Sequence, residues 1–160
     1  ARLLGDHVHA LITVGQIKTP EPRIRLFERL QRSGCALPVI VSPHAYVSPH
    51  ASVGGGTIVM HGAVINAAAV VGRNCIINSQ SLIEHDAVID DHCHVATGAA
   101  INSGVRIGAA TFIGSNSSVR QMVQIGARCL IGMGQRVLAD CAAGTCLPPL
   151  ENMPALGSKS

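Results

Sequence analysis

At 160 residues, the chain has room for one domain, or for one domain and a fragment of another. Apolar residues make up 48% of it, but with no Trp, one Tyr and two Phe the core must be narrow and built from small side chains. The net charge of +3 is modest, and the basic residues are not interleaved with aromatic ones. These two features exclude a typical nucleic-acid-binding surface.

The sequence also argues against a membrane or secreted protein. It contains no run of 18 apolar residues and no signal-peptide pattern. Its six cysteines contain no Cys-x-x-Cys pair, so neither a zinc ribbon nor a redox motif is indicated. We therefore expect a soluble cytoplasmic protein with no membrane partner. The first residue is Ala rather than Met, which suggests a truncated domain.

Residues 1–40 are expected to form part of an α/β unit. Residues 7–14 are typical of a buried strand that ends before Gly15, and residues 37–41 of a second short strand. Between them, residues 19–34 predict a helix with Thr19 as its N-cap and Gly34 at its end. This order is similar to the end of a doubly wound, Rossmann-like nucleotide-binding domain, without the Gly-rich phosphate loop that would precede it.

From Val41 to Val137, every sixth residue is Val or Ile, without an insertion. The residue four positions after each of them is small or β-branched, with Gln135 as the exception. Helices repeat apolar residues every three to four positions and strands every two. A strict period of six therefore indicates short strands joined by tight corners, with each coil stacked about 4.8 Å from the next.

Residues 41–140 accordingly predict an all-β solenoid of about 5.7 three-hexad coils, roughly 27 Å long. Glycine, Asn and Asp directly after the aliphatic residue, as at Gly72 and Asp90, suit the corners. Four cysteines fall in the small position and are interpreted as packing residues: Cys75, Cys93, Cys129 and Cys141. Residues 141–160 contain three prolines and are expected to form a cap or tail.

The densest group of chemically active side chains runs from residue 84 to residue 94. His85 directly precedes Asp86, and this pair suits acyl transfer: the imidazole removes a proton from the nucleophile while the carboxylate orients the imidazole. His94 lies nine residues later, half of an 18-residue coil, so the two histidines should point to different sides of one prism. They could meet in the seam between neighbouring prisms, and a three-sided prism favours a homotrimer.

Three segments carry a resemblance to a known family: residues 64–67 (VINA), 76–89 (IINSQSLIEHDAVI) and 94–98 (HVATG). They are similar to the NeuD/PglD-type sugar acetyltransferases of the hexapeptide-repeat acyltransferase superfamily, over residues from about 8 to 140. The resemblance implies a left-handed parallel β-helix, a homotrimer and acetyl-CoA as the acyl donor, with no metal.

By position, the resemblance makes His85 the general base and Asp86 the residue that raises its basicity. Asn78 and Glu84 would lie near the sugar acceptor, and Gly15 matches a glycine of the nucleotide-sugar-binding domain. The cofactor would be bound by five residues along the coils and the tail: His94 near the thioester, Ser115, Gly132 and Met133 along the pantetheine, and Pro154 near the adenine. The basic residues Arg106, Arg120, Arg128 and Arg136 are candidates for its phosphates.

The expected function is acetyl transfer from acetyl-CoA to an amino group of a nucleotide-linked deoxyamino sugar. Within the same class, O-acetylation of sialic acid is the alternative. A metal-dependent hydratase similar to carbonic anhydrase is a second alternative, with His44, His50, His61 and His92 as its possible ligands. A solenoid with a purely structural role is the third.

Overall fold

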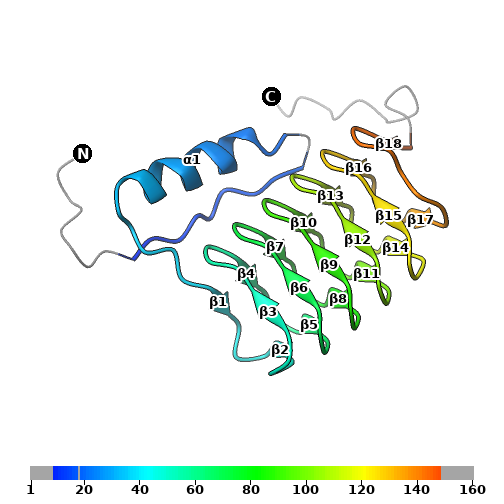
Figure 1. The fold of residues 1–160 in the computed structure, drawn as a ribbon, viewed down its shortest axis with the longest axis horizontal. Coiled ribbons are helices and arrows are strands. Elements are labelled where there is room, and N and C mark those ends of the chain that lie inside the picture. Colours follow the sequence, from blue (N-terminus) through cyan, green and yellow to red (C-terminus); the bar gives the residue numbers. More distant parts are fainter. Residues whose placement is uncertain (1–8, 18, 149–160) are drawn as a thin grey trace, which may run out of the picture.

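The structure, a computed structural model, describes residues 9–17 and 19–148. In these residues one helix, α1 (Glu21–Arg32), precedes eighteen two-residue strands that coil into a three-sided prism (Figure 1). Each side of the prism is one parallel sheet, and strands that follow one another in the chain lie on successive sides. The predicted β-solenoid is therefore confirmed, with about 6 turns.

We name each sheet by its first and last strands. The β1–β18 sheet consists of β1 (Ile40–Val41), β4 (Ile58–Val59), β7 (Ile76–Ile77), β10 (His94–Val95), β13 (Phe112–Ile113), β16 (Leu130–Ile131) and β18 (Cys146–Leu147). The β2–β17 sheet consists of β2 (Tyr46–Val47), β5 (Val64–Ile65), β8 (Leu82–Ile83), β11 (Ala100–Ile101), β14 (Ser118–Val119) and β17 (Arg136–Val137). The β3–β15 sheet consists of β3 (Ser52–Val53), β6 (Val70–Val71), β9 (Val88–Ile89), β12 (Arg106–Ile107) and β15 (Gln124–Ile125).

The hexad pattern builds the core as expected. The second residue of each strand points inward, so that Ile65 pairs with Ile83 in the next coil and both are completely buried. The small residue four positions later is equally buried, as at Ala69 and Cys75. Val41 is 45% exposed because it lies in the first strand of its sheet, where no earlier coil covers it.

The corners are two-residue turns, and in most of them the second residue adopts a left-handed backbone. We name the three columns of corners after one feature of each. The Asp86 corner contains Ala68, Asp86, Gly104 and Met122; the Gln80 corner contains Gly62, Gln80, Gly98, Asn116 and Gly134; the α1 corner contains Gly56, Asn74, His92, Ala110 and Arg128.

The predicted role of the glycines that directly follow the aliphatic residue was wrong in detail. Gly72 and Gly114 lie just before the turn, and neither has a left-handed φ. A Cβ atom on Gly72 would lie 2.6 Å from the backbone nitrogen of Asp91 in the next coil. Glycine is therefore required there by the close approach of two coils rather than by backbone conformation.

The N-terminal part forms less regular structure than expected. Residues 7 and 8 of the first expected strand lie outside the described residues, and the rest of it makes one isolated parallel bridge, between His9 and Ala36. Helix α1 begins at Glu21, two residues after the expected N-cap Thr19. The comparison with a Rossmann-like domain, and the domain boundaries at residues 40 and 140, stay predictions.

Strand pairing continues past residue 140, where the hexad pattern ends. Ile125 pairs with Cys141 and Ile131 pairs with Leu147, both 16 residues apart, whereas earlier partners such as Ile65 and Ile83 are 18 apart. The last coil is thus two residues shorter. Cys141 consequently occupies a strand position opposite Ile125, not the small position that the period assigned to it.

The segment before β1 covers part of the prism. Residues 11–15 lie over the β1–β18 sheet, and α1 runs beside the α1 corner (Figure 1). The buried Arg23 fixes this arrangement, because its guanidinium donates to the carbonyls of Ile12 (2.7 Å), Val14 (3.0 Å) and Asn74 (3.2 Å). No helix in the described part of the chain is long and apolar enough to span a bilayer.

Candidate active site

His85 and Asp86 form a hydrogen-bonded pair at the Asp86 corner, between β8 and β9. Nδ1 of His85 lies 2.7 Å from Oδ2 of Asp86, and both side chains are exposed. Asp86 is in the left-handed region at φ 61°, which turns its carboxylate back toward the preceding residue. A carboxylate can only accept, so Nδ1 carries a proton, and in the neutral imidazole Nε2 has the lone pair. Nε2 is therefore the atom that can act as a base.

Two neighbouring side chains complete this arrangement. Oε2 of Glu84 accepts hydrogen bonds from the backbone N–H of His85 (3.3 Å) and from Nδ2 of Asn66 (3.0 Å). Oγ of Ser103, one coil further on, lies 2.8 Å from Nε2 of His85. Glu84 thus supports the backbone at the base, while Ser103 contacts the basic nitrogen itself.

His94 lies on another side of the prism, as its nine-residue spacing from His85 predicted. It is on β10, only 8% exposed, and its Nδ1 donates to the backbone carbonyl of Gln16. Nε2 of His94 accepts from Nδ2 of Asn78 at 3.4 Å, and its ring packs edge-on against Phe112. Burial lowers the pKa of His94, so this imidazole is neutral at pH 7.

His94, Asn78 and Gly15 line a common cavity of about 430 Å³. Its floor is the outer face of the β1–β18 sheet, and residues 11–15 form its other wall. Most of the lining is apolar, supplied by Leu11, Ile12, Ile40, Ile58, Met60 and Ile76. The structure therefore brings together Asn78, His94 and Gly15, whereas His85, Asp86 and Glu84 form a second group on another corner.

Solved structures, but no protein-family profile and no curated protein sequence, match the chain. The acetyltransferase domain of PglB from Neisseria gonorrhoeae, solved with acetyl coenzyme A, is 31% identical with a TM-score of 0.79; the match covers 81% of this chain and 63% of that one. Perosamine N-acetyltransferase from Caulobacter crescentus, solved as a histidine-to-asparagine mutant with CoA and GDP-perosamine, is 30% identical with a TM-score of 0.79, covering 82% and 64%. WeeI from Acinetobacter baumannii is 18% identical with a TM-score of 0.73, covering 91% and 69%, and supports the fold alone.

The chain is a parallel β-solenoid similar to those of the PglB acetyltransferase domain and perosamine N-acetyltransferase. This confirms the resemblance that residues 64–67, 76–89 and 94–98 carry. The chain spans just under two thirds of the length of the PglB domain and of perosamine N-acetyltransferase.

The residues expected along the cofactor lie at or near the Gln80 corner of this hexapeptide-repeat prism. Ser115 accepts a backbone hydrogen bond from Gly134 one coil further on, and Met133 is 75% exposed. Gly132 is buried and its carbonyl accepts from Ser117 Oγ at 2.7 Å. Pro154 lies outside the described residues. Asn78 directly follows β7 at the same corner, so these residues share one edge of the prism.

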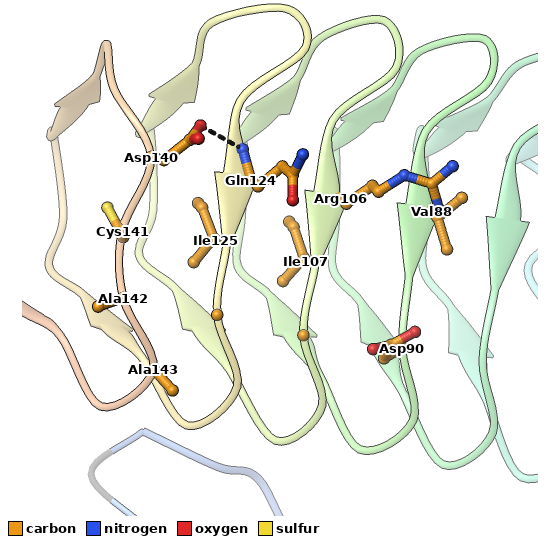
Figure 2. Close-up of a pocket in the computed structure, with 12 residues that line it drawn as sticks. Val88, Asp90, Arg106, Ile107, Gln124, Ile125, Asp140, Cys141, Ala142 and Ala143 are labelled. Carbon is orange, nitrogen blue, oxygen red and sulfur yellow. Dashed lines mark hydrogen bonds between the residues drawn. The ribbon is translucent and has the colours of Figure 1, made fainter.

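A groove of about 430 Å³ follows the outer face of the β3–β15 sheet toward the last coil (Figure 2). Arg106 lies over this face, and Asp140 accepts a hydrogen bond from the backbone N–H of Gln124 at 2.8 Å. Asp90 and Asp140 line the same groove as Arg106, so its charged side chains are two acidic and one basic. A second candidate for a phosphate, Arg128, forms an ion pair with Glu21 of α1. Arg120 and Arg136 are the exposed candidates that remain.

The histidines of the hydratase alternative do not converge in this chain. His92 packs on Phe27 of α1 and contacts Asn74, whereas His44 and His61 lie together with ring centroids 5.8 Å apart. Among the residues that the structure describes, no three His, Cys, Asp or Glu side chains could hold a metal ion together.

Sequence reasoning missed Ser103 and Arg23. Ser103 could have been found, because residues 18 apart stack in neighbouring coils and 85 plus 18 is 103. Arg23 gave no such signal, since its partners are backbone carbonyls in segments far apart in the sequence.

Proposed function

We propose that this protein transfers an acetyl group from acetyl-CoA to the amino group of a nucleotide-linked deoxyamino sugar. The observation that carries the proposal is the His85–Asp86 pair, in which an exposed imidazole holds its proton on Nδ1 and presents a basic Nε2. The relatives with bound acetyl-CoA, and with CoA and GDP-perosamine, supply the substrate classes. Because acetyl-CoA is a cytoplasmic donor, the expected location is the cytoplasm.

In the proposed reaction His85 is the only residue that carries a proton. The amino nitrogen attacks the thioester carbonyl and forms the C–N bond, while Nε2 of His85 takes one proton from that nitrogen. Asp86 stabilises the imidazolium through its bond to Nδ1. The C–S bond then breaks, and the proton returns from Nε2 to the sulfur. The products are the sugar acetamide and free CoA.

The residues that the resemblance implicates fall into two groups, so the complete site requires two chains. The β2–β17 sheet lies between the Asp86 corner and the Gln80 corner. If this sheet faces the axis of a three-fold ring, the Asp86 corner of one prism meets the Gln80 corner of the next. Its outer face suits contact, because it is formed by the mainly small or apolar residues Tyr46, Val64, Leu82, Ala100, Ser118 and Arg136.

In this homotrimer, His85, Asp86 and Glu84 come from one chain, and Asn78, His94, Ser115 and Met133 from its neighbour. Asn78 and Glu84 would contact the sugar, and Gly15 would border the acceptor's cavity. The pantetheine would follow the Gln80 corner past Ser115, Gly132 and Met133. The exposed Met122 (72%) and Met133 (75%) lie on the two corners that meet, where they provide apolar contact area.

A screen for release of free thiol from acetyl-CoA tests the activity. The acceptors are GDP- and UDP-linked deoxyamino sugars, their hydroxyl analogues, and free sialic acid. Thiol release with an amino sugar supports the proposal. Release with sialic acid alone indicates O-acetylation, and no release with any acceptor contradicts acyl transfer to a sugar.

Mixed trimers test the division of the site between chains. A His85→Ala chain is combined with a chain that carries Asn78→Ala and His94→Gln, and each variant alone should have little activity. Random mixing leaves about a quarter of the sites with both halves intact, so about a quarter of wild-type activity should return. If the mixture stays inactive while wild-type chains treated in the same way are active, the site does not lie between chains.

A further inference from the structure

Ser103 contacts the atom of His85 on which the proposed reaction depends. Its Oγ lies 2.8 Å from Nε2. Because Nδ1 of His85 carries the proton that Asp86 accepts, Nε2 of the neutral imidazole can only accept, and the Ser103 hydroxyl donates to it. In the free protein the Ser103 hydroxyl therefore occupies the lone pair of Nε2 that has to take the acceptor's proton.

An acceptor group must displace Ser103 from Nε2, because an imidazole nitrogen has one in-plane lone pair. The serine side chain stays beside the incoming atom after displacement, since its backbone is fixed in the next coil: Gly104, the residue after it, donates its N–H to the carbonyl of His85 at 3.1 Å. Oγ of Ser103 can then accept a hydrogen bond from a second hydrogen on the attacking atom of the acceptor, if that atom has one.

Amino and hydroxyl acceptors differ at this point. An uncharged amino group has two N–H bonds and one lone pair, so it can donate one hydrogen to Nε2 and the second to Oγ of Ser103. Its lone pair then points away from both, in the direction of the thioester. A hydroxyl group has one O–H bond, which it donates to Nε2, so Oγ of Ser103 can only donate to the hydroxyl oxygen. That bond occupies a lone pair of the atom that has to attack the thioester, whereas the bond from an amino group leaves the attacking lone pair free.

We propose that Ser103 is a specificity-determining residue that accepts the second N–H of the acceptor and so favours amino over hydroxyl acceptors. This inference rests on the proposed acetyl transfer with His85 as base. It goes beyond that proposal because it names the residue that selects the acceptor atom.

Ser103, His85 and Asp86 together resemble the Ser-His-Asp arrangement of enzymes that form an acyl-enzyme intermediate. An oxyanion site for attack by Ser103 would need free backbone N–H groups nearby. The N–H groups of the next two residues are already used: Gly104 donates to His85, and Val105 donates to the carbonyl of Asn102 at 3.3 Å. We therefore assign Ser103 to orientation of the acceptor and not to acyl transfer.

The test compares kcat/KM for the amino sugar that the wild type acetylates fastest with kcat/KM for its analogue that has a hydroxyl in place of that amino group. Ser103→Ala should lower the ratio of the two values by about 2- to 12-fold, the effect of one hydrogen bond. Ser103→Thr keeps the hydroxyl and should keep the ratio within about twofold. Ser52→Ala, at an exposed strand position on the β3–β15 sheet, is the matched control and should leave the ratio unchanged.

Three results would overturn the inference. If the ratio is the same in Ser103→Ala and wild type, Ser103 does not select the acceptor atom, although acetyl transfer itself stands. If intact-mass analysis after mixing with acetyl-CoA finds an acetyl group on wild type and not on Ser103→Ala, Ser103 is a nucleophile. If the wild type acetylates no amino sugar, the proposed function fails and the inference fails with it.

Discussion

Oδ2 of Asp86 accepts a hydrogen bond from Nδ1 of His85, the residue directly before it, over 2.7 Å. Side chains of adjacent residues in a strand point to opposite faces. The contact is possible here because the pair lies in a corner turn and Asp86 has a left-handed backbone. The same turn that closes the prism therefore fixes the orientation of the base.

Asp86→Asn should lower the rate of acetyl transfer by about tenfold to a hundredfold, because a hydrogen bond to a charged partner contributes about 1.5–3 kcal/mol. Asn tolerates the left-handed backbone, so the fold should be retained. Thiol release from acetyl-CoA measures the rate, and the free energy of unfolding serves as the control. A variant with unchanged kcat would remove Asp86 from the mechanism.

Alanine should lower the free energy of unfolding more at Gly114, just before a turn, than at Gly134, within a turn. A Cβ atom at Gly114 would lie 2.4 Å from the backbone carbon of Gly132, whereas a Cβ atom at Gly134 meets nothing within 4 Å. Gly134→Ala is therefore penalised only by its left-handed φ, by about 1–2 kcal/mol. Gly114→Ala forces two coils apart and should cost more, about 3 kcal/mol or above. Urea unfolding compares them, and the reverse order would contradict this explanation of the glycines.

Most of the prism could be predicted from the sequence because its rule is local and repeats. The Val or Ile of each hexad is the residue that becomes buried. Residues 18 apart pair in neighbouring coils, so the pairing of Ile65 with Ile83 follows from the period alone. The shortened last coil could not be predicted, because the change from 18 to 16 residues at Cys141 removes the period itself. The cavity was also hidden, since residues 11–15 reach His94 through contacts that no periodicity encodes.

Arg23→Ala should release the N-terminal segment from the prism. The side chain is buried, and its removal leaves the carbonyls of Ile12, Val14 and Asn74 without their donor. The expected loss is about 2–4 kcal/mol, and it should appear as faster hydrogen exchange of the α1 amides while the strands stay protected. Arg25→Ala, an exposed arginine on the same helix, is the control. Equal exchange in the two variants would contradict the role of Arg23.

The packing of the N-terminal segment, which includes α1, on the prism should weaken in mild acid. Burial lowers the pKa of both His92, under Phe27, and His94, bonded to Gln16, below the ordinary value of 6.5. Around His92, Asp91 and Glu28 raise its pKa while Arg73 and Arg23 lower it. Since the unfolded chain binds protons more readily than the folded one in this range, stability is fully present above about pH 6.5 and is lost as the pH falls below it.

Hydrogen exchange of the α1 amides at pH 7.5 and pH 5.5, corrected for the intrinsic exchange rates, measures this effect. Wild type should lose protection at the lower pH, and a variant with His92→Gln and His94→Gln should lose less. A pH response that is identical in the two proteins would mean that other groups cause it.

The most direct test of the account is thiol release from acetyl-CoA, with a nucleotide-linked amino sugar as acceptor, by wild type, His85→Ala and Arg25→Ala. Arg25 is an exposed residue of α1, away from the two corners of the proposed contact between chains. We predict that Arg25→Ala matches wild type and that His85→Ala is slower by roughly 10²–10⁴-fold, the contribution of a general base. A His85→Ala protein that releases thiol as fast as wild type would contradict the account.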